Sequence, residues 1–148
     1  MSEEDVEKLF TGISSMSLDS KVRIAIPAKF RKIIEERNPN GNPEKRHCVW
    51  IVTDIRKDKP YLACFDNRDW KRNWLYIPGA EVEKYELDRQ GRIVLTDRLV
   101  SHAHITKEVE DDIIIAGSPS QKHFELWKKD YFEVAYKTEM TGPKIWEM

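Results

Sequence analysis

An internal repeat constrains the fold of this chain more than any other feature of its sequence. Residues 17–26 (SLDSKVRIAI) are echoed by residues 86–95 (ELDRQGRIVL), so an Asp-x-x-x-Arg motif with apolar residues after it occurs twice. The segments that follow also recur in order: an apolar and basic stretch, two β-type runs and an aromatic-rich segment. They are residues 27–34, 49–52, 61–65 and 69–74, then residues 96–100, 113–116, 124–127 and 130–136. An ordered series of this kind predicts two structural halves of the same build.

Each copy of the motif contains turn-forming residues between two β-type runs, which predicts a hairpin tip. Gly91 adopts a positive φ without strain, whereas the β-branched Val22 at the matching position does not. We therefore expect the first tip to use a different turn from the second, or to shift its turn by one residue.

A short helix is predicted after each hairpin. Pro27 pre-sets φ for the first turn of a helix that runs to about residue 37, with Phe30, Ile33 and Ile34 on its buried face. In the second half, the Thr96 side chain caps a shorter helix that begins at Asp97.

Each half thus contains four short strands and two helices, with residues 77–80 as the joint between the halves. A unit of roughly 65 residues buries too little surface to be stable alone, so we expect the two halves to interlock. The hairpins are also expected to leave apolar strand edges uncovered, which predicts an oligomer. The residues concerned are Ile24, Ile26, Ile93 and Leu95.

Composition narrows the class of protein. The 148 residues suit one compact unit, and no apolar run approaches the ~18 residues of a membrane span. The acidic start, residues 1–5, lacks an apolar stretch behind it, so no secretory signal is expected. A reducing compartment follows, in which Cys48 and Cys64 remain free and buried.

Charge is balanced overall but not locally. The chain has 25 Lys+Arg and 26 Asp+Glu, which argues against an evenly basic coat but leaves room for a basic patch. Residues 17–32 contain a single acid and five bases, whereas acids and bases are equal in residues 86–100. The first motif is therefore the more basic of the two.

The Asp-x-x-x-Arg pairs have two interpretations. Asp19 with Arg23, and Asp88 with Arg92, could be ion pairs that only fix the turn, since an exposed pair contributes ~0–1 kcal/mol. Alternatively, each aspartate orients its arginine for a phosphate or a guanine edge, which a guanidinium meets with a bidentate fork. The DNA-binding candidates are Arg23, Arg92, Lys21, Arg89, Lys29 and Arg31, with Asp19 and Asp88 as orienting carboxylates.

Other kinds of site find little support in the sequence. The histidines and cysteines lack the spacing of a zinc site, and no phosphate-cradling loop or catalytic motif is present. We therefore expect no metal, no cofactor, no small-molecule ligand and no enzymatic activity.

Residues 9–12 (LFTG) and 18–31 (LDSKVRIAIPAKFR) resemble the opening of MraZ proteins, which are bacterial transcription regulators with two SpoVT/AbrB-type repeats. Residues 87–93 (LDRQGRI) resemble the family's second motif, and residues 124–127 (FELW) resemble a strand near its C-terminal end. The sequence departs from the family at three places. Val22 replaces a usual Gly, Thr96 replaces an expected Pro, and residues 1–8 precede the usual start.

The resemblance implies an α+β, mainly β fold in which two AbrB-like swapped-hairpin units interlock into a small β-barrel with short flanking helices. It divides the chain into an acidic extension (1–8), repeat 1 (9–78), repeat 2 (79–138) and a tail (139–148). It implies a cytoplasmic, nucleoid-associated homo-oligomer, shaped as a ring, that binds double-stranded promoter DNA. The expected target is a set of repeats upstream of the division and cell-wall gene cluster that includes its own gene.

Two other classes of function stay open from the residues alone. A hydrolase with scattered Asp, Glu and His residues is disfavoured because no nucleophile and base occur at a catalytic spacing. An AbrB-like antitoxin or protein-interaction module is disfavoured because the resemblance leaves little chain for a partner-binding tail.

Overall fold

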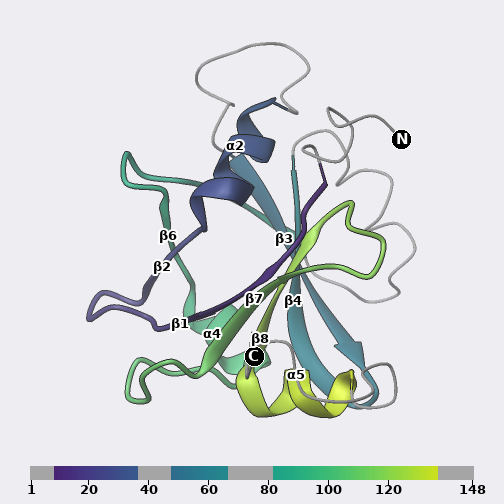
Figure 1. The fold of residues 1–148 in the computed structure, drawn as a ribbon. Helices are drawn as coiled ribbons and strands as arrows, with labels where there is room; N and C mark the ends of the chain where they lie inside the picture. The colour runs from purple at the N-terminus through teal and green to yellow at the C-terminus, as the bar shows by residue number, and fades with distance from the viewer. Residues whose placement is uncertain (1–8, 37–47, 67–81, 137–148) are drawn as a thin grey trace.

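The computed structural model describes residues 9–36, 48–66 and 82–136, and shows a mainly β, α+β fold (Figure 1). Eight strands and three helices lie in these ranges. They are β1 (Ile13–Met16), β2 (Arg23–Ala25), α2 (Ala28–Glu36), β3 (Cys48–Arg56), β4 (Lys59–Phe65), β5 (Val82–Glu86), β6 (Arg92–Val94), α4 (Asp97–Ala103), β7 (Ile113–Gly117), β8 (Phe124–Lys128) and α5 (Lys129–Ala135).

The strands form a six-stranded antiparallel sheet, ordered β1-β7-β8-β4-β3-β5, and a two-stranded ribbon of β2 and β6. In the six-stranded sheet the first strand of each sequence repeat pairs with the other repeat: β1 with β7, and β5 with β3. The order is therefore symmetric under exchange of the two repeats. Neither half completes its sheet from its own strands.

The ribbon has the same symmetry at the residue level. Ile24 and Ile93 occupy equivalent positions in the two repeats, and they are direct partners in the register. Around them, Leu95 N–H donates to the Val22 carbonyl (3.0 Å) and Ile26 N–H donates to the Gly91 carbonyl (2.9 Å). The β2–β6 ribbon thus lies on a pseudo-twofold axis between the repeats.

Two expectations about the sheets were wrong. No closed barrel forms from the described strands, because β1 and β5 are the two edges of an open sheet. The apolar residues expected at uncovered edges are at most 2% exposed, since the two hairpins cover each other within one chain. They are Ile24, Ile26, Ile93 and Leu95. Their exposure therefore gives no reason for oligomerisation.

The expectation that the two tips use different turns was also wrong. Val22 has φ 59° and Gly91 has φ 75°, so the β-branched residue adopts the same left-handed conformation as the glycine. Both residues donate their N–H to the carbonyl of the preceding motif aspartate. Val22 is half-buried and packs against a buried apolar cluster that includes Ile24, Phe30 and Leu95. This burial offsets the cost of its backbone conformation.

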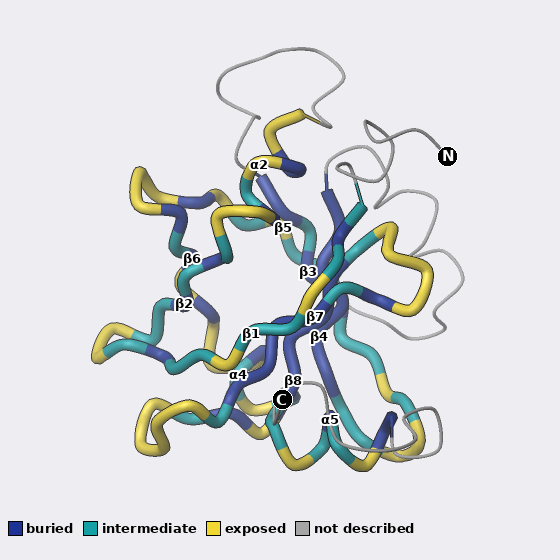
Figure 2. The backbone as a smooth tube through the Cα atoms, in the orientation of Figure 1, coloured by how far each residue is buried: buried dark blue, intermediate teal, exposed yellow. Residues whose placement is uncertain are grey.

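The helices and strands otherwise follow the sequence pattern. In α2 the buried residues are Phe30, Ile33 and Ile34, and in α4 the Thr96 side chain caps the Leu99 N–H. Burial is concentrated in the strands, and the exposed residues lie in tips and loops (Figure 2). Cys48 and Cys64 are buried thiols that form no disulfide with each other, as expected. The expected helix at 69–74 and the joint at 77–80 lie outside the described residues.

Candidate nucleic-acid interface

The first hairpin tip is organised by the carboxylate of Asp19. Its Oδ1 accepts hydrogen bonds from the backbone N–H of Lys21 (2.9 Å) and of Arg23 (2.9 Å). Its Oδ2 accepts from Arg23 Nε at 2.7 Å. A short carboxylate side chain before a turn bonds in this way because the backbone N–H groups two and four residues later face it. One aspartate therefore fixes both the turn and the arginine.

The second tip repeats this geometry with different residues between the motif positions. Asp88 Oδ1 accepts from the N–H of Gln90 (2.8 Å) and of Arg92 (2.9 Å), and Oδ2 accepts from Arg92 Nε at 2.9 Å. The arrangement depends on the Asp-x-x-x-Arg spacing and on a left-handed residue before the arginine, and not on the other turn residues.

Both arginines keep their terminal nitrogens available. Only Nε of Arg23 and of Arg92 bonds to a side chain among the described residues, and each arginine side chain is about a quarter exposed (23% and 28%). An arginine held at Nε still presents a planar pair of N–H donors, which matches a phosphate or the edge of a guanine.

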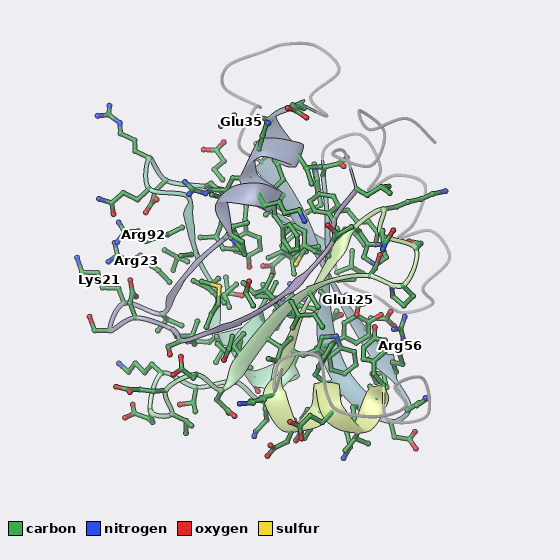
Figure 3. The ribbon with its side chains drawn as sticks, in the orientation of Figure 1. Lys21, Arg23, Glu35, Arg56, Arg92 and Glu125 are labelled. Carbon is green, nitrogen blue, oxygen red and sulfur yellow. The ribbon has the colours of Figure 1, made fainter. Side chains whose placement is uncertain are left out.

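The two arginines share one face of the ribbon. Residues alternate between faces along a strand, and Ile24 and Ile93 point into the core with no exposed surface. Their neighbours on both strands therefore point outward. Figure 3 shows Arg23, Arg92 and Lys21 on the same side of the molecule, beyond β2 and β6. The two tips also project from this side (Figure 1). The interface candidate is hence a cationic ribbon face formed jointly by both repeats.

The carboxylates at the tips are held in the charged state. Loss of hydration raises the pKa of Asp19, but the hydrogen bonds from Arg23 and Lys21 outweigh it, and the pKa lies below its ordinary value of 3.8. For Asp88 the backbone N–H of Arg92 is the main cause of a lowered pKa, opposed by loss of hydration and supported by the Arg92 side chain.

These lowered pKa values predict an acid-sensitive tip. Their contribution to the free energy of unfolding is present above the ordinary pKa of 3.8 and is lost as pH falls through the lower pKa of the folded state. We expect Asp19→Asn to be less stable than the parent at pH 7, and the difference to shrink towards pH 2. Urea unfolding of both proteins across this range measures it. A difference that does not change with pH would contradict the role of the charged carboxylate.

The other four predicted DNA contacts do not all lie at the hairpin tips. Lys21 and Arg89 are exposed at the tips, as a phosphate contact requires. Lys29 instead bonds through Nζ to Thr11 Oγ1, away from the motif carboxylates.

Arg31 crosses from repeat 1 to the second hairpin. Its side chain lies over Gly91, and Nη1 donates to the Gln90 carbonyl at 3.5 Å. It lines a shallow pocket of about 190 Å³ with Glu35, Leu87, Asp88, Arg89 and Gly91. The structure therefore gives Arg31 a packing role that its basic character alone did not predict.

Sequence reasoning missed two residues on the ribbon face. Val94 is 56% exposed, and Ala25 occupies the equivalent position in repeat 1. The signal was available: in Arg23-Ile24-Ala25 and Arg92-Ile93-Val94 the third residue lies on the same face as the arginine.

A buried carboxylate in the opposite part of the molecule was also missed. Glu125 Oε1 accepts from Trp127 Nε1 (3.0 Å) and from the Tyr136 hydroxyl, and Oε2 lies 3.7 Å from Arg56 Nη2. Burial raises its pKa, although these partners act against the rise. Glu125 and Arg56 lie far from the ribbon face in Figure 3. Their neighbours Trp127 and Tyr136 belong to a buried apolar cluster that also contains Phe132 of α5. We assign Glu125 and Arg56 to the packing of α5 on the sheet.

No group of three or more potential metal ligands occurs in residues 9–36, 48–66 and 82–136. Within the same ranges, no helix is long and apolar enough to cross a bilayer.

Comparison with known proteins places the chain in a family. Residues 80–141 match the family described as "MraZ protein, putative antitoxin-like". A transcriptional regulator MraZ of Nitratidesulfovibrio vulgaris strain Hildenborough is 30% identical over 135 residues, which cover 84% of each chain. Those of Alkaliphilus metalliredigens (29% identical; 90% of this chain, 99% of the relative) and Hydrogenovibrio crunogenus (27%; 85% and 84%) are similar over comparable lengths. The chain therefore belongs to the MraZ family of transcriptional regulators.

Proposed function

We propose that this protein regulates transcription by binding double-stranded DNA sequence-specifically through the ribbon face. The observation that carries the proposal is the pair of Asp–Arg units, which have the same hydrogen bonds at both tips and present both arginines on one surface. Because each guanidinium is held at Nε, its terminal nitrogens stay available to a ligand on that surface.

The dimensions of the ribbon suit the major groove. The groove of B-DNA is ~12 Å wide and admits a two-stranded ribbon. Arg23 and Arg92 lie in neighbouring outward-facing rows of the register, and such rows are about 6.8 Å apart along a strand. With 3.4 Å per base pair, this spacing corresponds to about two base-pair steps. Lys21 and Arg89, at the tips, would then contact phosphates.

The relatives support the biological part of the proposal. They are named transcriptional regulators, and the expected target is a set of promoter repeats upstream of a division and cell-wall gene cluster that includes the protein's own gene. Such a protein would act in the cytoplasm at the nucleoid, without a small-molecule ligand. The exchange of strands β1 and β5 between the repeats supports swapped-hairpin units, with boundaries proposed at 9–78 and 79–138.

A homo-oligomer, in the form of a ring, remains part of the proposal. Its support is the open sheet, whose edge strands β1 and β5 have one neighbouring strand each among the described residues and can pair with a neighbouring copy. An antitoxin-like interaction is the second candidate, favoured by the description of the matching family. In that case a protein partner, and not DNA, would occupy the ribbon face.

The proposal is tested with a duplex from upstream of the protein's own gene and a scrambled duplex of equal length. Fluorescence anisotropy at several salt concentrations should show preference for the upstream duplex and a steep fall in affinity with salt, because each neutralised phosphate releases counterions. Light scattering on the same samples gives the mass of the assembly. Equal, weak binding of both duplexes would exclude sequence-specific regulation by this protein.

A further inference from the structure

Val94 is a large apolar side chain in the middle of a cationic face. It is 56% exposed, it lies directly opposite Arg23 in the register, and it is two residues from Arg92 on β6. Single exposed apolar residues are common. The position of this one, with an oriented guanidinium on both sides, is what requires an explanation.

The register brings Val94 close to Arg23. Backbone hydrogen bonds join Val22 to Leu95 and Ile26 to Gly91, two residues to either side of the Ile24–Ile93 pair. Hydrogen-bonded and non-hydrogen-bonded pairs alternate along an antiparallel ladder, so Arg23–Val94 is a non-hydrogen-bonded pair. In such pairs the Cβ atoms lie about 4.5–5.5 Å apart. Since Nε of Arg23 is held at the tip by Asp19 (2.7 Å), a short neighbouring side chain can reach the same ligand surface.

We infer that Val94 contacts the 5-methyl group of a thymine next to the base bound by Arg23. The inference rests on the DNA-binding function proposed above. In the major groove, arginine recognises guanine through O6 and N7, and apolar side chains recognise thymine through its methyl group. The Arg23–Val94 pair therefore offers complementary contacts for two neighbouring bases.

The equivalent position in the other repeat gives this contact a consequence for orientation. Ala25 lies opposite Arg92 as Val94 lies opposite Arg23. A ribbon with identical halves would bind a site equally well in either direction. The larger side chain on one half distinguishes the two halves of the site, so the bound sequence is asymmetric.

The test uses the full chain and removes single methyl groups from the DNA. A duplex library of random sequence is selected with the protein, and each thymine of the selected site is replaced in turn by deoxyuridine, which pairs identically but lacks the methyl. We expect one replacement to weaken binding by about fourfold, as the loss of one buried methyl group predicts. In Val94→Ala the same replacement should have no effect, because the two changes remove one contact.

Two variants control the experiment. Val94→Thr keeps the β-branched shape that suits a strand. Circular dichroism of Val94→Thr and of Val94→Ala shows whether the ribbon folds in each variant. Val134→Ala removes a comparably exposed valine (47%) from α5 and should leave the uridine scan unchanged. If every deoxyuridine replacement weakens binding equally in the parent and in Val94→Ala, while Arg23 is still required for selection, the methyl contact is wrong and the DNA-binding function stands. If the protein selects no sequence, both fail.

Discussion

Arg23→Ala is expected to abolish preference for the specific site while the protein remains folded. One bidentate base contact accounts for ~1–3 kcal/mol of discrimination, or about 5- to 150-fold per site. If several protomers bind repeated sites at once, the loss multiplies across the assembly. Anisotropy titrations on specific and scrambled duplexes at two salt concentrations measure it.

The two arginines are not expected to contribute equally. The first motif lies in the more basic segment, with Lys21 at its tip, whereas Glu86, Asp88 and Asp97 neutralise the surroundings of the second. Arg92→Ala should therefore weaken binding less than Arg23→Ala. Asp19→Asn keeps Arg23 but weakens both its orientation and the turn, and it should weaken specific binding less than Arg23→Ala does. Specific binding by Arg23→Ala at the affinity of the parent would leave the ion pair with a role in the turn alone.

Gly91→Val is expected to destabilise the protein by about 2 kcal/mol, mainly through backbone strain at the second tip. A β-branched residue at φ 75° costs roughly 1–2 kcal/mol. In addition, a Cβ at Gly91 would lie 2.1 Å from Arg31 Cδ, so the arginine would have to leave its place over the tip. Because the Arg31 atoms nearest this Cβ are the far end of a flexible side chain, the displacement adds little beyond the contacts that Arg31 loses. Urea unfolding followed by circular dichroism measures the sum.

Val22, which occupies the position equivalent to Gly91 in the first repeat, provides the control for this change. Val22→Gly removes the backbone strain at the first tip but also a half-buried side chain that packs on the core, so its net effect should be within about 1 kcal/mol. A Gly91→Val protein as stable as the parent would show that the backbone of the second tip is not held in the left-handed conformation.

The elements that the sequence predicted correctly depend on local patterns. The helix after Pro27, the Thr96 cap and the buried strands all follow from spacing and residue type. Interlocking of the two halves was expected from their size. The particular pairings, β1 with β7 and β5 with β3, and the open sheet were not predictable, because register between distant strands leaves no local signal. The left-handed Val22 was missed for a different reason, since tertiary packing overrides the intrinsic preference of a β-branched residue.

For the candidate site, the sequence predicted the Asp–Arg contacts correctly but not the positions of two of the basic side chains. The Asp-x-x-x-Arg spacing correctly indicated that each aspartate would bond its arginine. Net charge did not indicate that Lys29 would turn to Thr11 or that Arg31 would cover the opposite repeat, because a basic residue satisfies the same charge count wherever its side chain points. The DNA contacts themselves remain predictions.

The pairing of β2 with β6 sets the order in which the protein becomes functional during synthesis. Ile24 and Ile93 are 69 positions apart in the chain. At ~5–20 residues per second, the ribosome needs about 3–14 s to add the residues between them. During that interval the first motif has no partner strand, and its apolar residues are open to the same segment of a neighbouring nascent chain. The surface that we propose to bind DNA is therefore completed only when the second half of the chain has left the ribosome.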